Sequence, residues 1–287
     1  MTSHLTEDEY HRLARGYDEN PRKSLSLNAE TYTDPRWHKL DQNAIISRSW
    51  QWVCHVEKLR DPGSYLTTVI AEQPIALVRD RDGQLRGFYN VCKHRAHELL
   101  SGEGLATRIM CPYHAWTYEL TGGLRAAPNA KSVEGFDKSK ICLTEVRTEE
   151  FLGFIFVNLD TDAKPMDEWF PNARAELESF VPQWAELKPL EWIDIPENSN
   201  WKVSVENYSE CYHCSLNHPT FSTGVIKPET YDIQPQGYCL RHTTESGPLD
   251  QMSYDINSGF ENNEKYSSWF LWPMFSFQVY PGNLLNT

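Results

Sequence analysis

The chain has 287 residues, enough for one large domain or two smaller ones, and 40% of them are apolar, which allows a sizeable core. A formal net charge of −13, from 27 Lys and Arg against 40 Asp and Glu, argues against nucleic acid as a partner, because phosphate binding needs a basic face. No apolar run approaches the roughly 18 residues of a membrane helix, and the polar N-terminus lacks a secretory signal, so we expect a cytoplasmic protein with no membrane partner.

Short strands are the main feature of the first half of the sequence. Residues 1–45 have the composition of a helical and loop lead-in, and from residue 46 the pattern changes. Strand-like segments bounded by turn residues predict strands at 64–70, 74–80, 84–90, 116–120 and 153–158. The turn at residues 80–83 would join two of them in a hairpin. We therefore predict a small antiparallel β domain over residues 46–160.

Two mixed pairs of cysteine and histidine lie within this β domain. One residue separates Cys92 from His94, and two residues separate Cys111 from His114. In a Rieske-type [2Fe–2S] cluster two thiolates hold one iron and two imidazoles hold the other. Each pair follows a predicted strand, so each loop would present one thiolate and one imidazole. These four residues are therefore the predicted ligands of such a cluster.

A tetrahedral zinc site is the alternative for the same four residues. Structural zinc sites usually pair their ligands as C-x₂₋₄-C and H-x₃₋₅-H, whereas both pairs here are mixed. His97 lies three residues after His94, and we interpret it as a surface residue or a neighbour of the cluster. An odd count of 7 cysteines does not indicate a disulfide framework. We interpret Cys211 and Cys214 as small buried apolar residues and not as a Cys-x₂-Cys pair of thiolate ligands.

The second half of the sequence, residues 161–287, mixes helical and strand-like segments. Helical composition at 165–180 is interrupted or begun by Pro171, and residues 201–219 are expected to form a second helix. An aromatic, strand-like stretch follows at 267–282. We therefore expect a separate α+β domain here, and an α+β fold class for the chain.

Glu210, His213 and His218 form a second candidate metal motif. On a helix Glu210 and His213 share a face, but His218 lies about 140° further round from His213. Pro219 disfavours helical backbone at His218, so a bend at 216–218 would bring the two imidazoles together. The motif therefore predicts two ligands of a 2-His-1-carboxylate iron site, which leaves positions open for O₂.

Both motifs resemble those of a known family. NVCKHRAHELLSGEG…MCPYHAWTYELTGGLR (90–125) resembles the Rieske domain of ring-hydroxylating oxygenase α subunits, and ENYSECYHCSLNHP (206–219) resembles their iron motif. The resemblance runs from about Tyr32 to the end of the chain. It implies a Rieske [2Fe–2S] domain followed by a catalytic domain of helix-grip type with a mononuclear Fe(II).

The same resemblance implies an assembly and an electron supply. Members of the family form head-to-tail homotrimers, sometimes with a β subunit. Electrons would come from NAD(P)H through a flavin and iron–sulfur reductase. An acidic residue, Glu210 in this sequence, would bridge a cluster histidine of one subunit and an iron-binding histidine of its neighbour.

The residues around Glu210 also suggest a substrate class. Glu within ECYHC is similar to the branch that acts on quaternary ammonium compounds, such as carnitine monooxygenases and betaine demethylases, whereas aromatic-ring dioxygenases typically carry Asp. A trimethylammonium group donates no hydrogen bond, so aromatic faces would recognise it. The candidate pocket residues are Trp269, Phe270, Trp272, Phe277 and Tyr280.

The resemblance therefore implies an oxygenase component that hydroxylates its substrate with O₂, with demethylation or C–N cleavage of a carnitine- or betaine-type compound as the expected reaction. The alternative within the family is the α subunit of an aromatic-ring dioxygenase. Alternatives from other classes are a Rieske electron carrier without oxygenase activity and a zinc-stabilised binding module.

The third iron ligand, a carboxylate, lies far after the second histidine in this family. No acidic residue here has the matching context, although four are available: Asp232, Asp250, Asp255 and Glu261. We therefore expect the ligand to follow residue 287 and the sequence to be incomplete at its C-terminus. A chain of residues 1–287 is then expected to keep a reducible cluster but to lack oxygenase activity.

Overall fold

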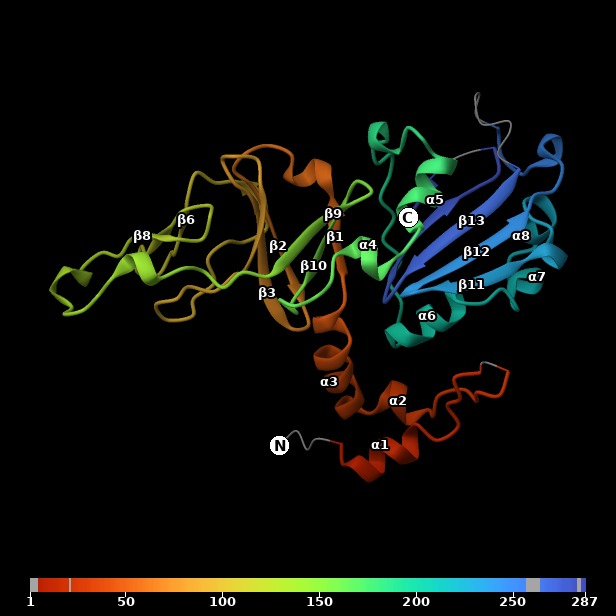
Figure 1. Ribbon diagram of the computed structural model, residues 1–287, viewed down its shortest axis with the longest axis horizontal. Helices are drawn as coiled ribbons and strands as arrows, with labels where there is room; N and C mark the ends of the chain where they lie inside the picture. The colour runs from red at the N-terminus through yellow and green to blue at the C-terminus, as the bar shows by residue number, and fades with distance from the viewer. Residues whose placement is uncertain (1–4, 21, 257–263, 283–284) are drawn as a thin grey trace.

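Three short helices precede the first strand. The structure, a computed structural model, describes residues 5–20, 22–256, 264–282 and 285–287. The helices are α1 (Glu7–Leu13), α2 (Glu30–Thr33) and α3 (Pro35–Ala44). Helix α1 begins with a capping box, in which Thr6 and Glu9 each accept the other's backbone N–H. In Figure 1 these helices lie below the two β-rich parts of the chain.

The first β-rich part contains three antiparallel sheets. Their strand orders are β1-β10-β9, β4-β3-β2-β5 and β6-β7-β8. Strands β3 and β4 pair in the hairpin expected around residues 80–83. The bounds are β1 (Gln51–His55), β2 (Ser64–Ile70), β3 (Gln73–Arg79), β4 (Leu85–Tyr89), β5 (Glu103–Leu105), β6 (Ile109–Met110), β7 (Thr117–Tyr118), β8 (Leu124–Ala126), β9 (Arg147–Phe151) and β10 (Phe154–Asn158).

Two hydrophobic clusters fill this part of the molecule. One includes Ile75 and Leu77 of β3 and Ile155 of β10. The other lies beneath the loops that follow β4 and β6, and it includes the side chains of Cys92 and Cys111. The two loops are therefore anchored by apolar packing as well as by the strands.

Helices α4 (Met166–Trp169) and α5 (Ala173–Phe180) connect the two β-rich parts, with Pro171 between them as expected. One large core cluster spans this connection. It joins Trp50 and Phe156 of the first part to Leu177 of α5 and Trp269 of the second part. The two parts consequently share a core.

A five-stranded antiparallel sheet, in the order β11-β12-β13-β14-β15, forms the second β-rich part. Its strands are β11 (Asp232–Gln236), β12 (Cys239–Glu245), β13 (Lys265–Leu271), β14 (Phe275–Val279) and β15 (Leu285–Asn286). Helix α5 lies on one face, where the Phe180 ring is 5.6 Å from that of Trp269. Helix α6 (Trp201–Tyr208) lies on the other face, where the Tyr208 ring is 5.3 Å from that of Phe270. The predicted α+β class is confirmed.

The helix expected over residues 201–219 is wrong in its extent. The chain instead forms α6, a turn, and two further helices, α7 (Cys214–Asn217) and α8 (Pro219–Gly224). In the turn the Glu210 carboxylate accepts the Tyr212 N–H, so a side chain competes with helical backbone bonding. Pro219 begins α8 instead of ending a helix, because the first turn of a helix tolerates proline.

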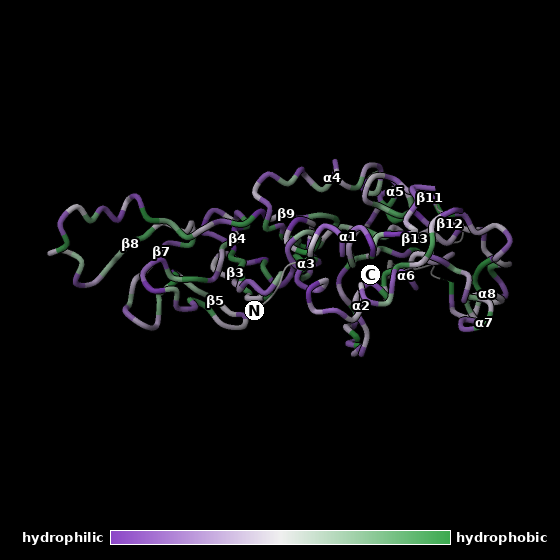
Figure 2. Tube along the Cα trace, turned by 90° about the horizontal axis from the view of Figure 1, so that it is seen from below, coloured by the Kyte–Doolittle hydropathy of each residue, from purple (hydrophilic) through white to green (hydrophobic). Residues whose placement is uncertain are grey.

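The molecule is elongated, and the two predicted metal sites lie at opposite ends of it. The strands β6 and β8, beside the Cys/His loops, are at one end, and α7 and α8, beside the His/His motif, are at the other (Figure 1). Figure 2 shows the same separation after a 90° turn. Within the ranges given above, no helix has the length and apolar character that crossing a membrane requires.

Candidate metal centres

Two loops in the first β-rich part, 92–97 and 111–116, have the same backbone construction. In both, the cysteine N–H donates to the carbonyl five residues later at 2.8 Å, and the N–H four residues later donates back to the cysteine carbonyl at 3.0 Å. The residue at that fourth position, Ala96 or Ala115, has a φ of 55° or 57°. The sequence contains the same repeat, because an alanine follows each of the two cysteines at a Cys-x₃-Ala spacing. The spacing of the cysteines and histidines alone does not reveal it.

These loops bury both predicted cysteine ligands in one hydrophobic cluster and bring the two predicted histidine ligands together. Cys92 and Cys111 are free cysteines and each is only 3% exposed. The rings of His94 and His114 lie 4.7 Å apart, and Trp116 stacks on His94 with 4.8 Å between ring centroids. The Nδ1 of His114 is buried and has no hydrogen-bond partner in the described part of the chain. Two buried thiols beside two imidazoles fit the mixed ligand set of a Rieske cluster.

Tyr118 contacts one of the two thiols directly. Its hydroxyl lies 3.2 Å from the Cys92 Sγ and accepts the Lys93 N–H at 3.0 Å. Because the hydroxyl oxygen is already an acceptor, its own proton is available to the sulfur. Tyr118 is fully buried, so water does not compete for this contact.

The surroundings of His114 favour its neutral, metal-binding form. Desolvation, followed by the charges of His94, Arg95 and His97, lowers the pKa of His114 below its ordinary value. His97 itself is exposed, and its Nδ1 lies 2.6 Å from the carbonyl oxygen of its neighbour Glu98. The structure thus places His97 at the surface beside the cluster loops.

His213 and His218 lie on either side of the single-turn helix α7. His213 is the N-cap of α7 and His218 its C-cap, and the backbone of His218 is not helical, with φ −123° and ψ 58°. The two rings are 5.1 Å apart and line the same cavity. The bend expected before Pro219 therefore brings the imidazoles together. Nowhere in the described ranges do three or more His, Cys, Asp or Glu side chains surround one ion position.

Glu210 orients His213. Its Oε1 lies 2.6 Å from the His213 Nδ1, and its other oxygen accepts the Tyr212 N–H. Burial alone would raise the pKa of the Glu210 carboxyl, but these hydrogen bonds hold it below its ordinary value. The contact leaves the His213 Nε2 for a metal, as is usual where a carboxylate orients a ligating histidine. The carboxylate side chain remains 43% exposed.

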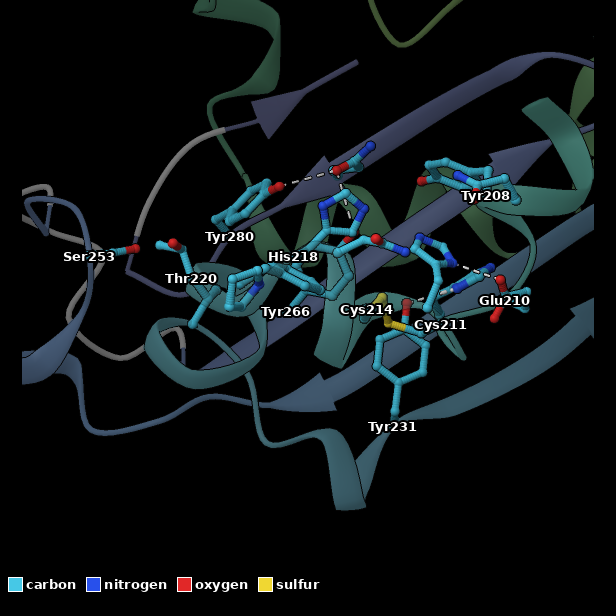
Figure 3. A pocket seen from close by; sticks show the side chains of 18 of the residues that line it. Tyr208, Glu210, Cys211, Cys214, His218, Thr220, Tyr231, Ser253, Tyr266 and Tyr280 are labelled. Carbon is cyan, nitrogen blue, oxygen red and sulfur yellow. Dashed lines mark hydrogen bonds and ion pairs between the residues drawn. A yellow bond between two sulfur atoms is a disulfide. The ribbon is translucent and has the colours of Figure 1, made fainter. Parts of the chain in front are cut away.

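Cys211 and Cys214, interpreted above as separate apolar residues, form a disulfide in the structure. That interpretation is therefore wrong. The turn between α6 and α7 brings their Cα atoms to 5.0 Å, which is within the range that a disulfide bridges. The bond closes the short segment that contains His213 (Figure 3).

A cavity of about 570 Å³ opens beside the two histidines. Aromatic rings from several elements line it: Tyr208, Phe221, Tyr231, Tyr254, Tyr266 and Tyr280. In Figure 3, Tyr280 and Tyr208 lie on either side of His218. The lining includes the Glu210 carboxylate and, among the described residues, no Lys or Arg. The cavity therefore combines aromatic faces with negative charge.

Four of the five aromatic residues expected in the pocket do not line it. Trp269 and Phe277 are fully buried on the α5 face of the sheet, because strand alternation points them away from the cavity. Phe270 packs on Tyr208, and the ring of Trp272 is 5.8 Å from that of Trp201. Only Tyr280 of the five is among the described residues that line the cavity.

Sequence reasoning missed most of the residues that line the cavity. The tyrosines come from α6, from the segment before β11, from β13 and from a loop, so no single stretch of sequence groups them. One signal was present, since Tyr266 and His242 alternate with core-facing residues on paired strands. His242 is a further lining residue that was not anticipated.

None of the described candidates for the third iron ligand lies in the cavity wall. Asp232, Asp250 and Asp255 are exposed, and none of them is among its lining residues. Glu261 lies outside the described residues. The carboxylate of the iron site therefore stays without an assignment to any of these positions.

Comparison with known proteins agrees with this arrangement. A Rieske [2Fe–2S] domain model matches residues 49–137, and a ring hydroxylating alpha subunit (catalytic domain) model matches residues 184–286. The chain therefore belongs to the Rieske-type ring-hydroxylating oxygenase α-subunit family, whose members are oxidoreductases with a [2Fe–2S] cluster and a mononuclear iron.

Individual relatives indicate a branch of that family. The carnitine monooxygenase oxygenase subunit of Escherichia coli (strain K12) is 35% identical over 270 residues, which cover 94% of this chain and 71% of the relative. The glycine betaine monooxygenase oxygenase subunit of Chromohalobacter salexigens is 33% identical over 210 residues, which cover 72% and 46%. A solved quaternary ammonium Rieske monooxygenase is 32% identical with a TM-score of 0.74, covering 88% of this chain and 67% of the other.

Proposed function

We propose that this chain is the oxygenase component of an enzyme that hydroxylates a quaternary ammonium compound of the carnitine or betaine type with O₂. The observation that carries the proposal is the cavity beside His213 and His218, with its aromatic walls and a carboxylate. Relatives named for carnitine and glycine betaine support the same class of substrate.

The cavity suits a cation that donates no hydrogen bonds. An aromatic face attracts a trimethylammonium group by roughly 0.5–2 kcal/mol, depending on how far the pair is desolvated. Burial raises the pKa of Tyr231, Tyr266 and Tyr280, so these phenols stay neutral and keep their ring faces for the cation. Glu210 adds a negative charge to the same wall.

Each of the two sites has a proposed set of metal ligands. The cluster would be held by Cys92, His94, Cys111 and His114, and the mononuclear iron by His213 and His218. When bound, the cluster supplies single electrons and the mononuclear iron activates O₂. Glu210 keeps the His213 ring in one orientation through the 2.6 Å contact with Nδ1.

The proposed reaction is an oxidation at a carbon bonded to the ammonium nitrogen. Hydroxylation consumes O₂, two electrons and two protons, and it yields the C–OH product and water. The C–N bond of that product then breaks, so the nitrogen leaves as a tertiary amine, the carbon becomes an aldehyde and one proton is released. The aromatic walls hold the C–H bond in place and exclude water from it.

Electrons would reach the iron from another copy of the chain. The two sites lie at opposite ends of one molecule (Figure 1), so a head-to-tail homotrimer is the arrangement that brings them together. The exposed His94 and the 43% exposed Glu210 carboxylate are the residues we propose to meet across that boundary. The report on the solved relative refers to inter-subunit electron transfer in that protein. A flavin and iron–sulfur reductase would supply the electrons from NAD(P)H.

The alternatives fit these observations less well. A Rieske electron carrier needs neither the histidine pair nor the aromatic cavity beside it. An aromatic-ring dioxygenase would need an apolar cavity, whereas this one carries Glu210, His242 and several phenol hydroxyls. The tyrosine-rich wall therefore favours the cationic substrate.

The test is turnover of the natural full-length protein with an NADH-driven reductase component. L-carnitine and glycine betaine are compared with benzoate, and O₂ uptake, aldehyde and tertiary amine are measured. We expect equal amounts of O₂ consumed and amine released with at least one ammonium compound. Coupled turnover of benzoate alone would overturn the substrate class, and the absence of any O₂ consumption would favour the electron carrier.

A further inference from the structure

His242 is a buried polar residue in the cavity wall to which the proposed chemistry assigns no role. It lies in the middle of strand β12 and is 1% exposed. The ring of Tyr208 is 5.7 Å away on one side and the ring of Tyr231 is 5.8 Å away on another. Its side chain is on the cavity face of the sheet, where the same Tyr208 packs on Phe270.

The two ring nitrogens of His242 differ in their contacts. Nδ1 lies 2.9 Å from the Tyr231 hydroxyl, whereas Nε2 is buried without a hydrogen-bond partner in the described part of the chain. Burial lowers the pKa of His242 to about 4, so the ring is neutral at pH 7 and carries one proton. Either group can donate in this contact, and we assign the Tyr231 hydroxyl as the donor to Nδ1, which places the imidazole proton on Nε2.

The phenol hydroxyls elsewhere in the wall are already engaged. Tyr266 and Tyr280 donate to the Gln278 Oε1 at 3.3 and 3.5 Å, and Tyr208 bonds Ser268. The His242 Nε2 therefore has no partner among the described residues, on a wall whose tyrosine hydroxyls are paired. A buried donor without a partner is costly, and a ligand that accepts its proton is favoured.

The cavity wall consequently offers two kinds of contact. The rings of Phe221, Tyr266 and Tyr280 are within 5.1–6.2 Å of one another and present apolar faces. His242 lines the same wall beside Tyr208 and Tyr231, and its buried Nε2 has no partner among the described residues. A molecule that carries both a cation and an oxygen acceptor matches both.

We infer that His242 is a substrate-binding residue, whose Nε2–H donates a hydrogen bond to a hydroxyl or carboxylate oxygen of the substrate while the aromatic rings of the wall hold the ammonium group. The inference rests on the proposed function and adds a second recognition point to it. It makes the enzyme selective for ammonium compounds that carry an oxygen acceptor over those that carry none.

A role for His242 as a third iron ligand does not fit the structure. No set of three His, Cys, Asp or Glu side chains surrounds one ion position in the ranges described, although His213, His218 and His242 all line the cavity. Iron content therefore serves as an independent readout of whether a variant affects binding or the metal site.

Three variants distinguish the loss of the hydrogen-bond donor from the loss of the shape of the ring. His242→Leu removes both nitrogens. His242→Gln places an amide N–H where Nε2 lies, and His242→Asn places it nearer to Nδ1, so Gln is the rescue and Asn its matched control. Each is prepared as the full iron-loaded protein, and iron content and cluster EPR are required to equal those of the parent.

Binding is then measured by titration calorimetry without an electron donor, so turnover does not enter. The ligands are L-carnitine, γ-butyrobetaine, which lacks the hydroxyl, and tetramethylammonium, which has no oxygen. Loss of a hydrogen bond to a hydroxyl should weaken binding about 2- to 13-fold, and loss of one to a carboxylate about 13- to 160-fold. Tetramethylammonium should bind parent and variants equally.

The pattern across ligands decides the inference. Weaker binding of L-carnitine alone in the Leu and Asn variants, restored by Gln, identifies the hydroxyl as the acceptor, and weaker binding of both oxygen-containing ligands identifies the carboxylate. Unchanged affinities, an equal loss for tetramethylammonium, or loss of iron would each overturn the inference while the proposed substrate class stands. If the parent binds none of the three, the substrate class fails and the inference fails with it.

Discussion

The two metal-binding regions of this molecule are built in opposite ways. The proposed cluster ligands all lie within residues 92–114, on twin loops closed by backbone hydrogen bonds, with both cysteine side chains in a hydrophobic cluster. The iron histidines lie among short helices and turns at 209–224, where Tyr212 is 94% exposed and Leu216 is 86% exposed. One site is pre-formed by local packing, and the other depends on distant contacts.

This contrast predicts an order of robustness. Segments with few buried contacts open at low free energy, whereas segments packed into a core open only with the whole domain. Helix α6, which leads into the iron motif, is tied to the N-terminal lead-in by Lys202 and Asp41, 161 residues apart. We therefore expect perturbations to empty the iron site before they affect the cluster.

The largest expected effect is the loss of the cluster itself. In Cys92→Ser or His114→Ala one of the four ligands is missing, so the visible absorption and the reduced-state EPR signal should disappear, and the β domain should lose stability. His97→Ala is the matched control, because His97 is exposed beside the same loops. A cluster signal that survives either substitution would contradict the ligand assignment.

Removing an iron ligand should have an equally complete but confined effect. His213→Ala leaves one imidazole in the motif, so we expect mononuclear iron to be absent while the cluster EPR signal is unchanged, because the two sites lie at opposite ends of the molecule. Iron and sulfide analysis measures this. Asn217→Ala, in the same cavity wall, should retain all of its iron. Loss of the cluster in His213→Ala would refute the independence of the two regions.

The same contrast explains which features of the fold and the sites could be predicted from the sequence and which could not. The strands and loops that carry the proposed cluster ligands were predictable because their contacts are local, as in the 85–89 strand and the Cys92 loop that follows it. The cavity was not, because Tyr208, Tyr231 and Tyr266 meet only through tertiary packing. The single helix predicted over residues 201–219 is wrong, because side-chain contacts such as that of Glu210 with the Tyr212 N–H end it early. The periodicity of the sequence does not reveal such contacts.

Breaking the contact between α3 and α6 should cost stability. The Asp41 and Lys202 side chains are 5% and 10% exposed, and Asp41 also accepts the Trp201 indole N–H at 3.2 Å. Lys202→Met leaves a buried carboxylate without its cation, which typically costs about 3–5 kcal/mol. Urea unfolding should show this loss, and the double variant Asp41→Leu/Lys202→Met should recover most of it. A double variant as unstable as the single one would argue against the ion pair as the cause.

Changing Glu210 should affect turnover more than metal content. Glu210→Gln keeps the size of the side chain but removes the charge that orients His213, and loss of such a support typically costs about 10- to 100-fold in activity or metal affinity. We expect coupled amine release to fall by that factor with the cluster unchanged. Glu229→Gln, an exposed site outside the cavity lining, is the control. Full turnover in Glu210→Gln would rule out an essential role for the carboxylate.

The smallest expected effect is a change in the midpoint potential of the cluster. Tyr118→Phe removes the hydroxyl 3.2 Å from the Cys92 Sγ and keeps the buried ring that packs beneath the loops. A hydrogen bond to a ligand sulfur stabilises the reduced, more negative cluster, so its loss should lower the midpoint potential. A bond worth about 0.5–1.5 kcal/mol corresponds to roughly 20–65 mV for one electron.

Redox titration followed by EPR measures the shift. The control is Tyr113→Phe, whose hydroxyl is on an exposed ring beside His114, and it should leave the potential unchanged. An unchanged or raised potential in Tyr118→Phe would show that the hydroxyl proton does not reach the sulfur.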